Sequence, residues 1–473
     1  MLLVAACAGA GETTTTTAGG AVTTSEATGT TSPETTEATG TTVTESTTTT
    51  VIGEVPFPAE FVEAAEAAAL EAAGGEQIGG VVEIQGHNGG FEQDLVVSSL
   101  GPFTTGTGIE VQYTGGQDLG TRVETRVRAG DPPDVVQDSA AGNLVRYANE
   151  GALVPLDSFM DAEELRANFS PGVLASVTVD GQIYSPPSTI HPQMVWYNPH
   201  VYGGALPPGD WDELIAYSQE LADAGQKPWC MALSAGPNTG FPNAYLIETI
   251  FIKTYGAELA TQWAQGELPW TSPEVKDAFE NFGIIGTEDA MVYPGVAGAL
   301  AAPITDGPVG LFSDPPGCEM FHFGIYTGGI ILSQFPDLDP AEDMDFYALP
   351  AINPDYAKHE QASGWGVFAF NDTPQVQALM KYWASEEFQS LLASGGSWVM
   401  ANNKVSPDAY PTDLLRKGAQ QFVDADDIAF GPWYAGSNAV REAFGAAIVQ
   451  YMQDPGSLDG ALARVQDVVD GES

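Results

Sequence analysis

Val81-Val82-Glu83-Ile84 begins the part of the chain that decides the fold class, because this short apolar run has the length and composition of a buried β-strand. Ile109-Glu110-Val111-Gln112-Tyr113 alternates apolar and polar side chains, which predicts a half-buried strand. A helix is expected over Leu119 to Ala129, then a turn over Gly130-Asp131-Pro132-Pro133 and a third strand at Asp134-Val135-Val136. Strands that alternate with helices in this way predict an α/β layered fold.

Three later segments carry clear helix signals. Asp210-Trp211-Asp212-Glu213 is a capping box, and Gly225 is expected to end its helix. Thr373-Pro374 predicts the start of a second helix that runs to Gly395-Gly396. Ser437 predicts the N-cap of a third. The apolar stripes of these helices need no explanation beyond a packed core.

The composition limits the classes of partner. The chain has 473 residues with 63 acidic and 15 basic side chains, a net charge of −48. Such a surface repels nucleic acid and anionic lipid, so no nucleic-acid partner is expected. The nearest approach to a basic cluster is Arg122, Arg126 and Arg128, which we expect to form a solvated helix face. No run reaches the roughly 18 apolar residues of a membrane-spanning helix.

The first fifty residues indicate where the protein works. Val4-Ala5-Ala6 places small residues directly before Cys7, as at a bacterial lipoprotein cleavage site, and 20 of the 38 residues from Thr13 to Thr50 are threonine. We expect a lipidated Cys7 on a flexible tether, with the basic front of the signal missing. The alternative is a chance cysteine near a polar terminus. Of the three cysteines, Cys230 and Cys318 then remain, and in an exported chain they can pair.

Several phrases, in order across residues 81–452, resemble the extracellular sugar-binding proteins of ABC importers, the family that includes maltose-binding protein, and within it the α-glucoside branch. Each phrase alone is Gly/Pro turn chemistry, and their order carries the likeness. They are Thr107-Gly108-Ile109-Glu110-Val111, Gly130-Asp131-Pro132-Pro133-Asp134-Val135, Gly151-Ala152-Leu153-Val154-Pro155-Leu156-Asp157, Asp180-Gly181-Gln182-Ile183-Tyr184, Trp196-Tyr197-Asn198-Pro199, Trp211-Asp212-Glu213-Leu214, Pro228-Trp229-Cys230, Gly240-Phe241-Pro242, Pro315-Pro316-Gly317-Cys318 and Gly364-Trp365-Gly366.

The resemblance implies an α/β fold of two lobes, the type II periplasmic-binding-protein fold, which closes over a ligand in the cleft between the lobes. It implies crossings between the lobes near Tyr184–Ile190 and Phe346–Pro350, and it supports a Cys230–Cys318 disulfide. The expected organisation is a truncated signal with the lipidated cysteine (1–7), a Thr-rich tether (8–50), a lead-in (51–80) with a helix over 57–73, lobe I (81–187 plus 350–396) and lobe II (190–346 plus 397–473).

A neutral sugar stacks its C–H faces on aromatic rings and needs donors and acceptors around its rim. Among the aromatic candidates, Trp365 lies between two glycines just before an expected strand at 367–370, and stacking and core packing are equally good interpretations. Trp433 lies in a turn where the family places a sugar-stacking ring. Phe241 replaces the tryptophan usual in relatives. Trp398 follows Gly395-Gly396-Ser397 and is also a candidate, although core packing fits it better.

The polar candidates lie after strands or near a crossing. His87 and Asn88 follow the first strand, and Gln137 and Asp138 follow the third, where α/β folds bind ligands; a surface turn is the equal alternative for the first pair. His191 lies near the first crossing. Asp314 precedes Pro315-Pro316, where family members approach the ligand.

These observations predict a binding protein without catalysis, which hands a neutral mono- or oligosaccharide to membrane permease subunits. We expect a monomer outside the cytoplasm, anchored by lipid to the outer face of the bacterial cytoplasmic membrane, with no cofactor and no metal. The acidic run 337–345 could bind calcium but lacks EF-hand spacing, so a solvated loop fits it better. The alternatives are an exported glycoside hydrolase, which needs two carboxylates at a fixed separation, or the same fold binding a polyamine, a peptide or a metal chelate.

Overall fold

The computed structural model describes residues 55–116 and 118–472. Cys7, the tether 8–50 and the start of the lead-in 51–80 lie outside the described residues. No helix of the described part combines the length and the apolar character needed to cross a bilayer.

Parallel strands form the first part of the sheet, as the sequence predicts. β1 (Gly80–Gly86) pairs in parallel with both β2 (Ile109–Gly115) and β3 (Val135–Asp138). Val82 and Ile84 of β1 are fully buried. The expected helix α4 (Leu119–Ala129) connects β2 to β3.

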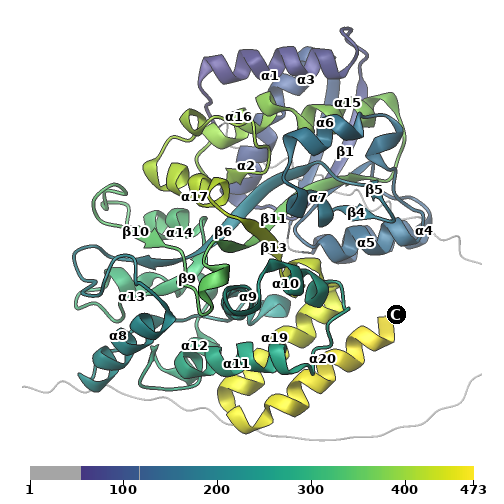
Figure 1. Ribbon diagram of the computed structural model, residues 1–473. Coiled ribbons are helices and arrows are strands. Elements are labelled where there is room, and N and C mark those ends of the chain that lie inside the picture. The colour runs from purple at the N-terminus through teal and green to yellow at the C-terminus, as the bar shows by residue number, and fades with distance from the viewer. Residues whose placement is uncertain (1–54, 117, 473) are drawn as a thin grey trace, which may run out of the picture. The chain divides into compact units, whose positions relative to one another are not determined.

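Two long antiparallel strands continue the sheet. β6 (Pro187–Tyr197) and β11 (His359–Ala369) pair with each other, and the last part of β11 pairs with β3. The second half of β6 instead pairs with β9 (Phe321–Gly324) and β10 (Asp345–Tyr347). Together with β12 (Val399–Met400) on β6 and β13 (Asp427–Phe430) on β11, nine strands of the described part form one sheet. There are thus two groups of strands, β1–β3, which β11 adjoins through β3, and β9 with β10, which pair with β6. Because β6 and β11 also pair with each other, they run from one part of the protein to the other (Figure 1).

Helices cover both groups of strands. The remaining α-helices are α1 (Ala59–Ala72), α2 (Gly90–Ser99), α3 (Gly101–Thr107), α5 (Ala141–Asn149), α6 (Ala162–Asn168), α7 (Pro171–Ala175), α8 (Trp211–Asp223), α9 (Phe241–Tyr255), α10 (Ala257–Ala264), α11 (Pro273–Gly286), α12 (Val296–Ala301), α13 (Val309–Phe312), α14 (Thr327–Gln334), α15 (Pro374–Ala384), α16 (Glu386–Ser394), α17 (Asp413–Val423), α18 (Pro432–Ala435), α19 (Asn438–Gln453) and α20 (Leu458–Glu472). The short strands are β4 (Thr178–Val179), which pairs with β5 (Gln182–Ile183), and β7 (Trp229–Cys230), which pairs with β8 (Val292–Tyr293).

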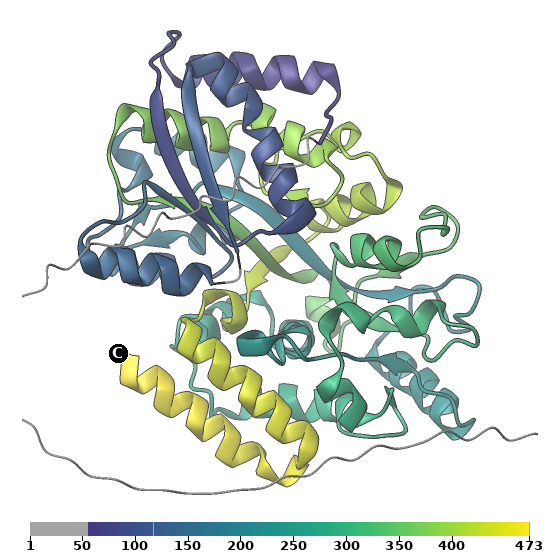
Figure 2. The same ribbon diagram turned by 180° about the vertical axis from the view of Figure 1, so that it is seen from behind.

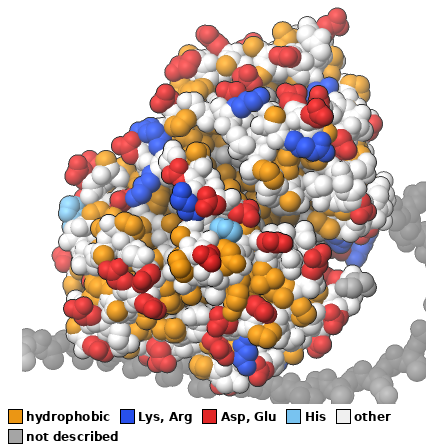
Figure 3. Space-filling model, in the orientation of Figure 1, with side chains coloured by type: hydrophobic (Ala, Val, Ile, Leu, Met, Phe, Trp, Pro, Cys, Tyr) orange, Lys and Arg blue, Asp and Glu red, His pale blue; other side chains and the backbone are white. Residues whose placement is uncertain are grey.

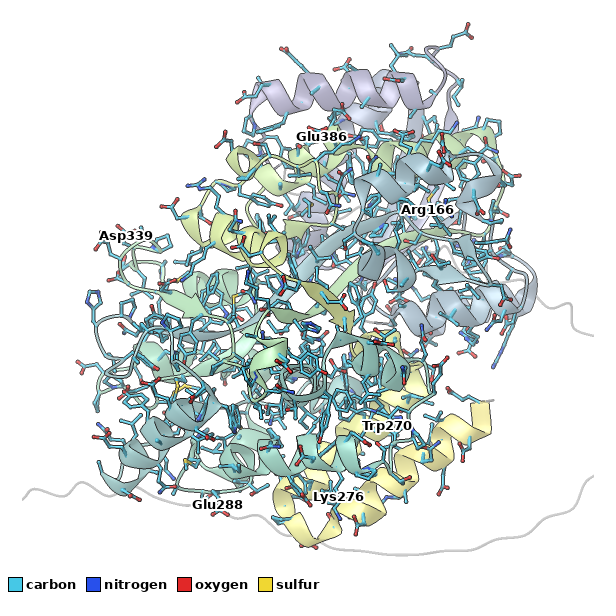
Figure 4. All side chains as sticks on the ribbon, viewed as in Figure 1. Arg166, Trp270, Lys276, Glu288, Asp339 and Glu386 are labelled. Carbon is cyan, nitrogen blue, oxygen red and sulfur yellow. A yellow bond between two sulfur atoms is a disulfide. The ribbon has the colours of Figure 1, made fainter. Side chains whose placement is uncertain are left out.

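The helices divide as the strands do. α1 packs against α3, α15 and α16 beside the β1–β3 strands, while α9 packs against α10, α11 and α19 (Figure 1). The C-terminal helices α19 and α20 lie side by side, as Figure 2 shows from behind. Figure 4 shows Trp270 among these helices, where its ring contacts Trp263 and Phe444. Each group of strands therefore has helices of its own, whereas the exact lobe boundaries stay a prediction.

Local capping signals are confirmed. The Asp210 carboxylate accepts the Glu213 N–H at 2.8 Å, and the Glu213 side chain reaches back to the N–H of Gly209 at 2.7 Å. Gly225 ends this segment in the left-handed region, with φ at +79°. The Ser437 hydroxyl accepts the Val440 N–H and starts α19.

One predicted helix is wrong in extent. The segment from Thr373 to Gly395 forms two helices, α15 and α16, that are separated at Ser385. Ser385 has extended backbone angles, and its hydroxyl accepts the N–H of Phe388 as an N-cap. The apolar stripe continues through the break, so periodicity alone did not reveal it.

The arginines of α4 are not a purely solvated face. Arg122 donates to the side chain of Gln85 at 3.0 Å and to the carbonyl of Gly86 at 3.2 Å, and Arg126 forms an ion pair with Glu83. Arg128 alone is strongly exposed. Two of the three arginines therefore hold α4 onto β1.

A disulfide joins Cys230 and Cys318, whose Cα atoms are 5.4 Å apart and whose side chains are buried. It connects the short strand β7 to the segment just before β9. The pairing implied by the resemblance is therefore present in the structure.

Candidate ligand-binding site

Polar side chains from the ends of β1 and β3 meet the ring of Trp365. The Nδ1 atom of His87 lies 3.2 Å from the carbonyl oxygen of Gln137, and the His87 ring meets Trp365 edge-on at 6.2 Å. Asn88 is the next residue and is also buried. Gln137 and Asp138 are the last two residues of β3 rather than residues beyond it. These predicted site residues therefore come together.

Trp365 lies inside β11, not in a turn before a strand, which corrects the sequence prediction. Its two glycine neighbours explain the error, because β6 and its lead-in approach β11 too closely for side chains there. A Cβ on Gly364 would lie 2.2 Å from the Thr189 carbonyl oxygen, and one on Gly366 would lie 2.5 Å from Ser185 Oγ. Trp365 is 2% exposed and meets Trp398 edge-on at 5.4 Å.

A second group of aromatic rings comes from α9, α18 and the segment after β9. Phe241, the first residue of α9, stacks on Trp433 with ring centroids 6.1 Å apart. The guanidinium of Arg441 in α19 lies 5.2 Å from the Trp433 ring centroid, and Phe241 also meets Tyr245 edge-on. Trp433 is 1% exposed, so its faces are covered by protein groups in this arrangement.

His191 connects the two groups. It lies in the middle of β6 opposite Ser363 of β11, and its ring meets Tyr326 at 5.4 Å. Burial, with a smaller contribution from the nearby His87, lowers the pKa of His191 to about 3. The pKa of His87 is lowered by burial, against the charge of Asp138, and Arg441 lowers it as well. Both rings are therefore held in the neutral form, in which each imidazole has one donor and one acceptor nitrogen.

Buried polar atoms without a hydrogen-bond partner concentrate here. Buried polar groups are nearly always paired, so unpaired ones in one place indicate a site that binds something. Of the twelve side chains in the described residues that carry such an atom, we call the following seven the polar cluster: Asn88 (Nδ2), Gln137 (Nε2), His191 (Nε2), Gln193 (Oε1), Gln361 (Oε1), Trp365 (Nε1) and Arg441 (Nε).

Contacts between the strands show that the polar cluster is one site. Gln193 of β6 donates to the hydroxyl of Ser363 at 3.2 Å, across the β6–β11 pair. Gln361, Ser363 and Trp365 alternate along β11, so they share one face of the strand. Val367 lies opposite Gln137 of β3.

Sequence reasoning missed Gln193, Gln361, Arg441 and the α9 residues Tyr245 and Glu248. One usable signal was present in α9, where Phe241, Tyr245 and Glu248 follow at helical spacing and share one face. The strand residues gave no signal, because nothing local distinguishes Gln193 or Gln361 from polar residues on a solvated face.

Asp314 lies elsewhere. It is exposed in the loop after α13, close in sequence to the disulfide, and no described contact connects it to the polar cluster. Trp398 is beside the polar cluster through its contact with Trp365, and it also hydrogen-bonds Glu92 of α2, whose pKa burial raises.

Two grooves open on the surface. One of about 940 Å³ is lined by Gly142 and Val145 of α5 and by Pro432, Gly436 and Val440 of the α18–α19 segment. The other, of about 970 Å³, lies around residues 206–212 and 345–352. Neither groove is lined by a residue of the polar cluster.

The acidic side chains do not gather in one patch on the face shown in Figure 3. Acidic side chains are scattered over the whole face shown in Figure 3, which agrees with the net charge of −48. The acidic run 337–345 is a surface loop that includes Asp339 (Figure 4). There Asp343 accepts the Asp339 N–H at 2.8 Å and pairs with His200 at 2.9 Å. No group of three or more His, Cys, Asp or Glu side chains in residues 55–116 and 118–472 could hold a metal ion.

Comparison with known proteins extends these observations. Residues 99–390 match the family described as bacterial extracellular solute-binding protein. The osmoprotective compounds-binding protein GgtB of Synechocystis is 32% identical over 345 residues, which are 72% of this chain and 81% of GgtB. The alpha-glucosides-binding periplasmic protein AglE of Rhizobium meliloti is 28% identical over 72% of this chain and 76% of AglE.

Solved structures show the same fold at low identity. The bacterial solute receptor AcbH matches with a TM-score of 0.69 and 18% identity, over 83% of this chain and 99% of AcbH. MalE3 of T. maritima with bound maltose matches with a TM-score of 0.62 and 17% identity, over 83% of this chain and all of MalE3. The predicted two-lobed α/β fold, with a cleft between the lobes, is thereby confirmed.

Proposed function

Because the chain belongs to the family of bacterial extracellular solute-binding proteins, we propose that it captures a neutral sugar or glycoside in the cleft between its lobes. The observation that supports this most is the polar cluster, in which unpaired donors and acceptors lie beside aromatic rings. A sugar offers both kinds of hydrogen-bonding group on one small molecule and apolar C–H faces as well.

The balance of donors and acceptors favours a sugar over the other solutes. Asn88, Gln137, Trp365 and Arg441 each offer an unpaired donor, whereas Gln193 and Gln361 offer acceptors. A polyamine carries only donors, so it would leave the four donor groups unpaired, at about 1–3 kcal/mol each. Hydroxyl groups of a sugar satisfy both kinds.

The carboxylates near the polar cluster are engaged in structural bonds, which favours binding over hydrolysis. Asp138 accepts the Ala140 N–H at 3.0 Å and the Asn143 amide at 2.7 Å. Glu248 accepts the Trp433 N–H at 2.6 Å and the Gln361 amide at 3.0 Å. A glycoside hydrolase needs two carboxyl groups available to the substrate.

The relatives narrow the sugar class. AglE is described as binding alpha-glucosides and GgtB as binding osmoprotective compounds. We therefore propose an α-glucoside-type ligand that the closed protein delivers to permease subunits of an ABC importer. Cys7 would carry lipid on the outer face of the cytoplasmic membrane, and the tether 8–50 would keep the monomeric receptor near its permease.

Thermal unfolding with a panel of maltose, trehalose, sucrose, galactose and spermidine tests the function. A bound ligand at 100 times its Kd stabilises the protein by about 2.7 kcal/mol. We expect at least one sugar to raise the Tm and spermidine to leave it unchanged. A Tm rise with spermidine alone, or cleavage of maltose or trehalose by the purified protein, would refute the proposal.

A matched pair of variants connects binding to the polar cluster. Arg441→Met removes the guanidinium above Trp433, whose Nε has no partner, and Arg464→Met removes an exposed arginine from α20. Only the first is expected to weaken the Kd, because only Arg441 reaches the cleft. Equal affinities of the two variants would place the ligand elsewhere.

A further inference from the structure

Glu248 is a buried carboxyl group on the cleft side of α9. It is 1% exposed and follows Phe241 and Tyr245 on the same helical face. Its Oε1 accepts the backbone N–H of Trp433 at 2.6 Å, and its Oε2 accepts Nε2 of Gln361 at 3.0 Å. One carboxyl group thus joins α9 to the Trp433 backbone in α18 and to the Gln361 side chain in β11.

The fit around this carboxyl group is close. Gly431, two residues before Trp433, lies directly against it, since a Cβ at position 431 would be 2.1 Å from the Glu248 carboxyl carbon. Any side chain at that position would displace the carboxyl group. The contact therefore fixes the turn that carries Trp433.

Both hydrogens of the Gln361 amide are committed. Nε2 donates to Glu248 at 3.0 Å and to the carbonyl of Ala362 at 3.2 Å, while Oε1 is buried without a partner. An amide can be turned over to exchange its donor and acceptor ends, and its partners decide which end is presented. Here a carboxylate that only accepts leaves Oε1 as the free end.

We propose that Glu248 is a positioning residue of the binding site, which holds the Trp433 turn in place and orients Gln361 so that its Oε1 accepts a hydroxyl of the bound solute. The inference rests on the proposed function for the identity of the solute. The orientation of Gln361 does not depend on it.

Protonation of Glu248 works against this orientation of Gln361. Burial raises its pKa to about 8, against the bonds from Trp433 and Gln361 and the charge of Arg441. The other ionisable group that faces this region is Tyr245 on α9, whose pKa burial raises to about 12. A protonated carboxyl group donates from one oxygen, so it no longer accepts from both Trp433 and Gln361. Turning Gln361 over would restore a bond to Glu248 but would set its Oε1 against the Ala362 carbonyl, so protonation weakens the hold on the Trp433 turn and on Gln361.

The ionisation of Glu248 determines how the affinity for the solute depends on pH. If the solute binds the arrangement with ionised Glu248, its affinity rises with pH until Glu248 is ionised in the free protein. With a pKa of about 8 in the free protein, this predicts a Kd about tenfold lower at pH 9 than at pH 7.

Three variants test the inference with the sugar found by the Tm panel. Glu248→Gln imitates the protonated side chain, because the introduced amide has one acceptor oxygen and cannot accept from both Trp433 and Gln361. We expect it to fold, to bind at least about tenfold more weakly than the wild type at pH 9, and to have the same Kd at pH 7 and pH 9. Glu319→Gln, at a carboxylate bonded to Tyr217 and Gly203 away from the polar cluster, is the matched control and keeps the wild-type pH profile.

The exchanged pair Glu248→Gln with Gln361→Glu provides the rescue. The introduced carboxylate accepts from the introduced amide and again presents an acceptor to the solute. We expect the affinity at pH 9 to recover above that of Glu248→Gln but not in full, because the Ala362 carbonyl loses the donor that Gln361 supplies. A general loss of packing at position 248 would not be repaired this way.

A readout without ligand separates this inference from the proposed function. The side-chain amide NMR signal of Gln361, assigned by its loss in Gln361→Glu, is expected to shift with a midpoint near pH 8 in the wild type and not in Glu248→Gln. A signal that does not titrate overturns the inference even if a sugar binds. If no sugar binds, the proposed function fails, and the titration of the amide alone decides the orienting role.

Discussion

Replacement of Gly142 by alanine tests whether α5 closes against α18. A Cβ at position 142 would lie 2.4 Å from the carbonyl carbon and oxygen of Gly436 and 2.6 Å from the carbonyl oxygen of Ala435. Gly142 belongs to the predicted lobe I and Gly436 to the predicted lobe II. In the proposed lobe organisation, this contact joins the two sides of the cleft at the end of α18, the helix that carries Trp433.

The expected loss of affinity follows from how closely the added Cβ would approach the backbone of α18 and Gly436. The two backbones must separate by about 1 Å to reach the ~3.5 Å contact distance of carbon atoms. Overpacking of this kind costs about 1–3 kcal/mol, which corresponds to a Kd about 5- to 150-fold weaker if the contact forms only in the closed state. The unliganded, open protein is not penalised, because alanine is favoured over glycine in helices by up to about 1 kcal/mol.

Isothermal titration with the sugar ligand measures the change in Kd, and the Tm of the unliganded protein shows whether the substitution affects its stability. Gly329→Ala in α14 is the matched control, since its added Cβ would meet no atom within 4 Å. A Kd for Gly142→Ala within twofold of the wild type would refute closure at this contact. A Tm loss without ligand would show that the contact belongs to the fold and not to closure.

Three further predictions concern stability. Reduction of the Cys230–Cys318 disulfide, or its replacement by two alanines, is expected to lower the free energy of unfolding by about 4–5 kcal/mol for a sequence separation of 88, as measured by denaturant titration; a loss below about 1 kcal/mol would contradict the loop-entropy reasoning. Burial lowers the pKa of His322 to about 3, so below pH 6.5 the unfolded chain binds a proton that the native protein excludes. The free energy of unfolding should therefore fall as the pH drops from about 6.5 to 3. His322→Leu should reduce this pH dependence, and an unchanged dependence would contradict the role of His322. Lys253→Met leaves Glu360 buried without its partner and should cost about 3–5 kcal/mol, most of which the double change with Glu360→Leu should recover; equal losses in the single and double variants would mean that the unpaired charge is not the cause.

The sequence predicted much of the fold, for reasons that are local. The strands at 81–84, 109–113 and 134–136 follow from apolar patterning, and the helix starts at Asp210 and Ser437 follow from side chains that cap the N–H groups of their own helix. The break at Ser385 was missed because the apolar face continues across it. Order and spacing of turn phrases were enough to indicate the two-lobed family fold.

Part of the candidate site could also be predicted from the sequence, and part could not. His87, Asn88, Gln137 and Asp138 could be chosen from sequence, because parallel strands bring their carboxyl ends to one edge of a sheet. Trp365 was a sequence candidate as well, although in a turn rather than in β11. Asp314 lies in an exposed loop after α13, and its approach to the ligand stays a prediction.

By itself, the sequence determined the elements, their caps and the family to which their order points, since these depend on neighbours along the chain. Only the tertiary structure decided which polar groups are left without partners. Gln193 meets Ser363 across 170 residues, and Glu248 meets the Trp433 backbone across 185. Whether a buried amide is paired depends on every segment folded around it, so the polar cluster and the orientation of Gln361 exist only once β6, β11, α9 and α18 have come together.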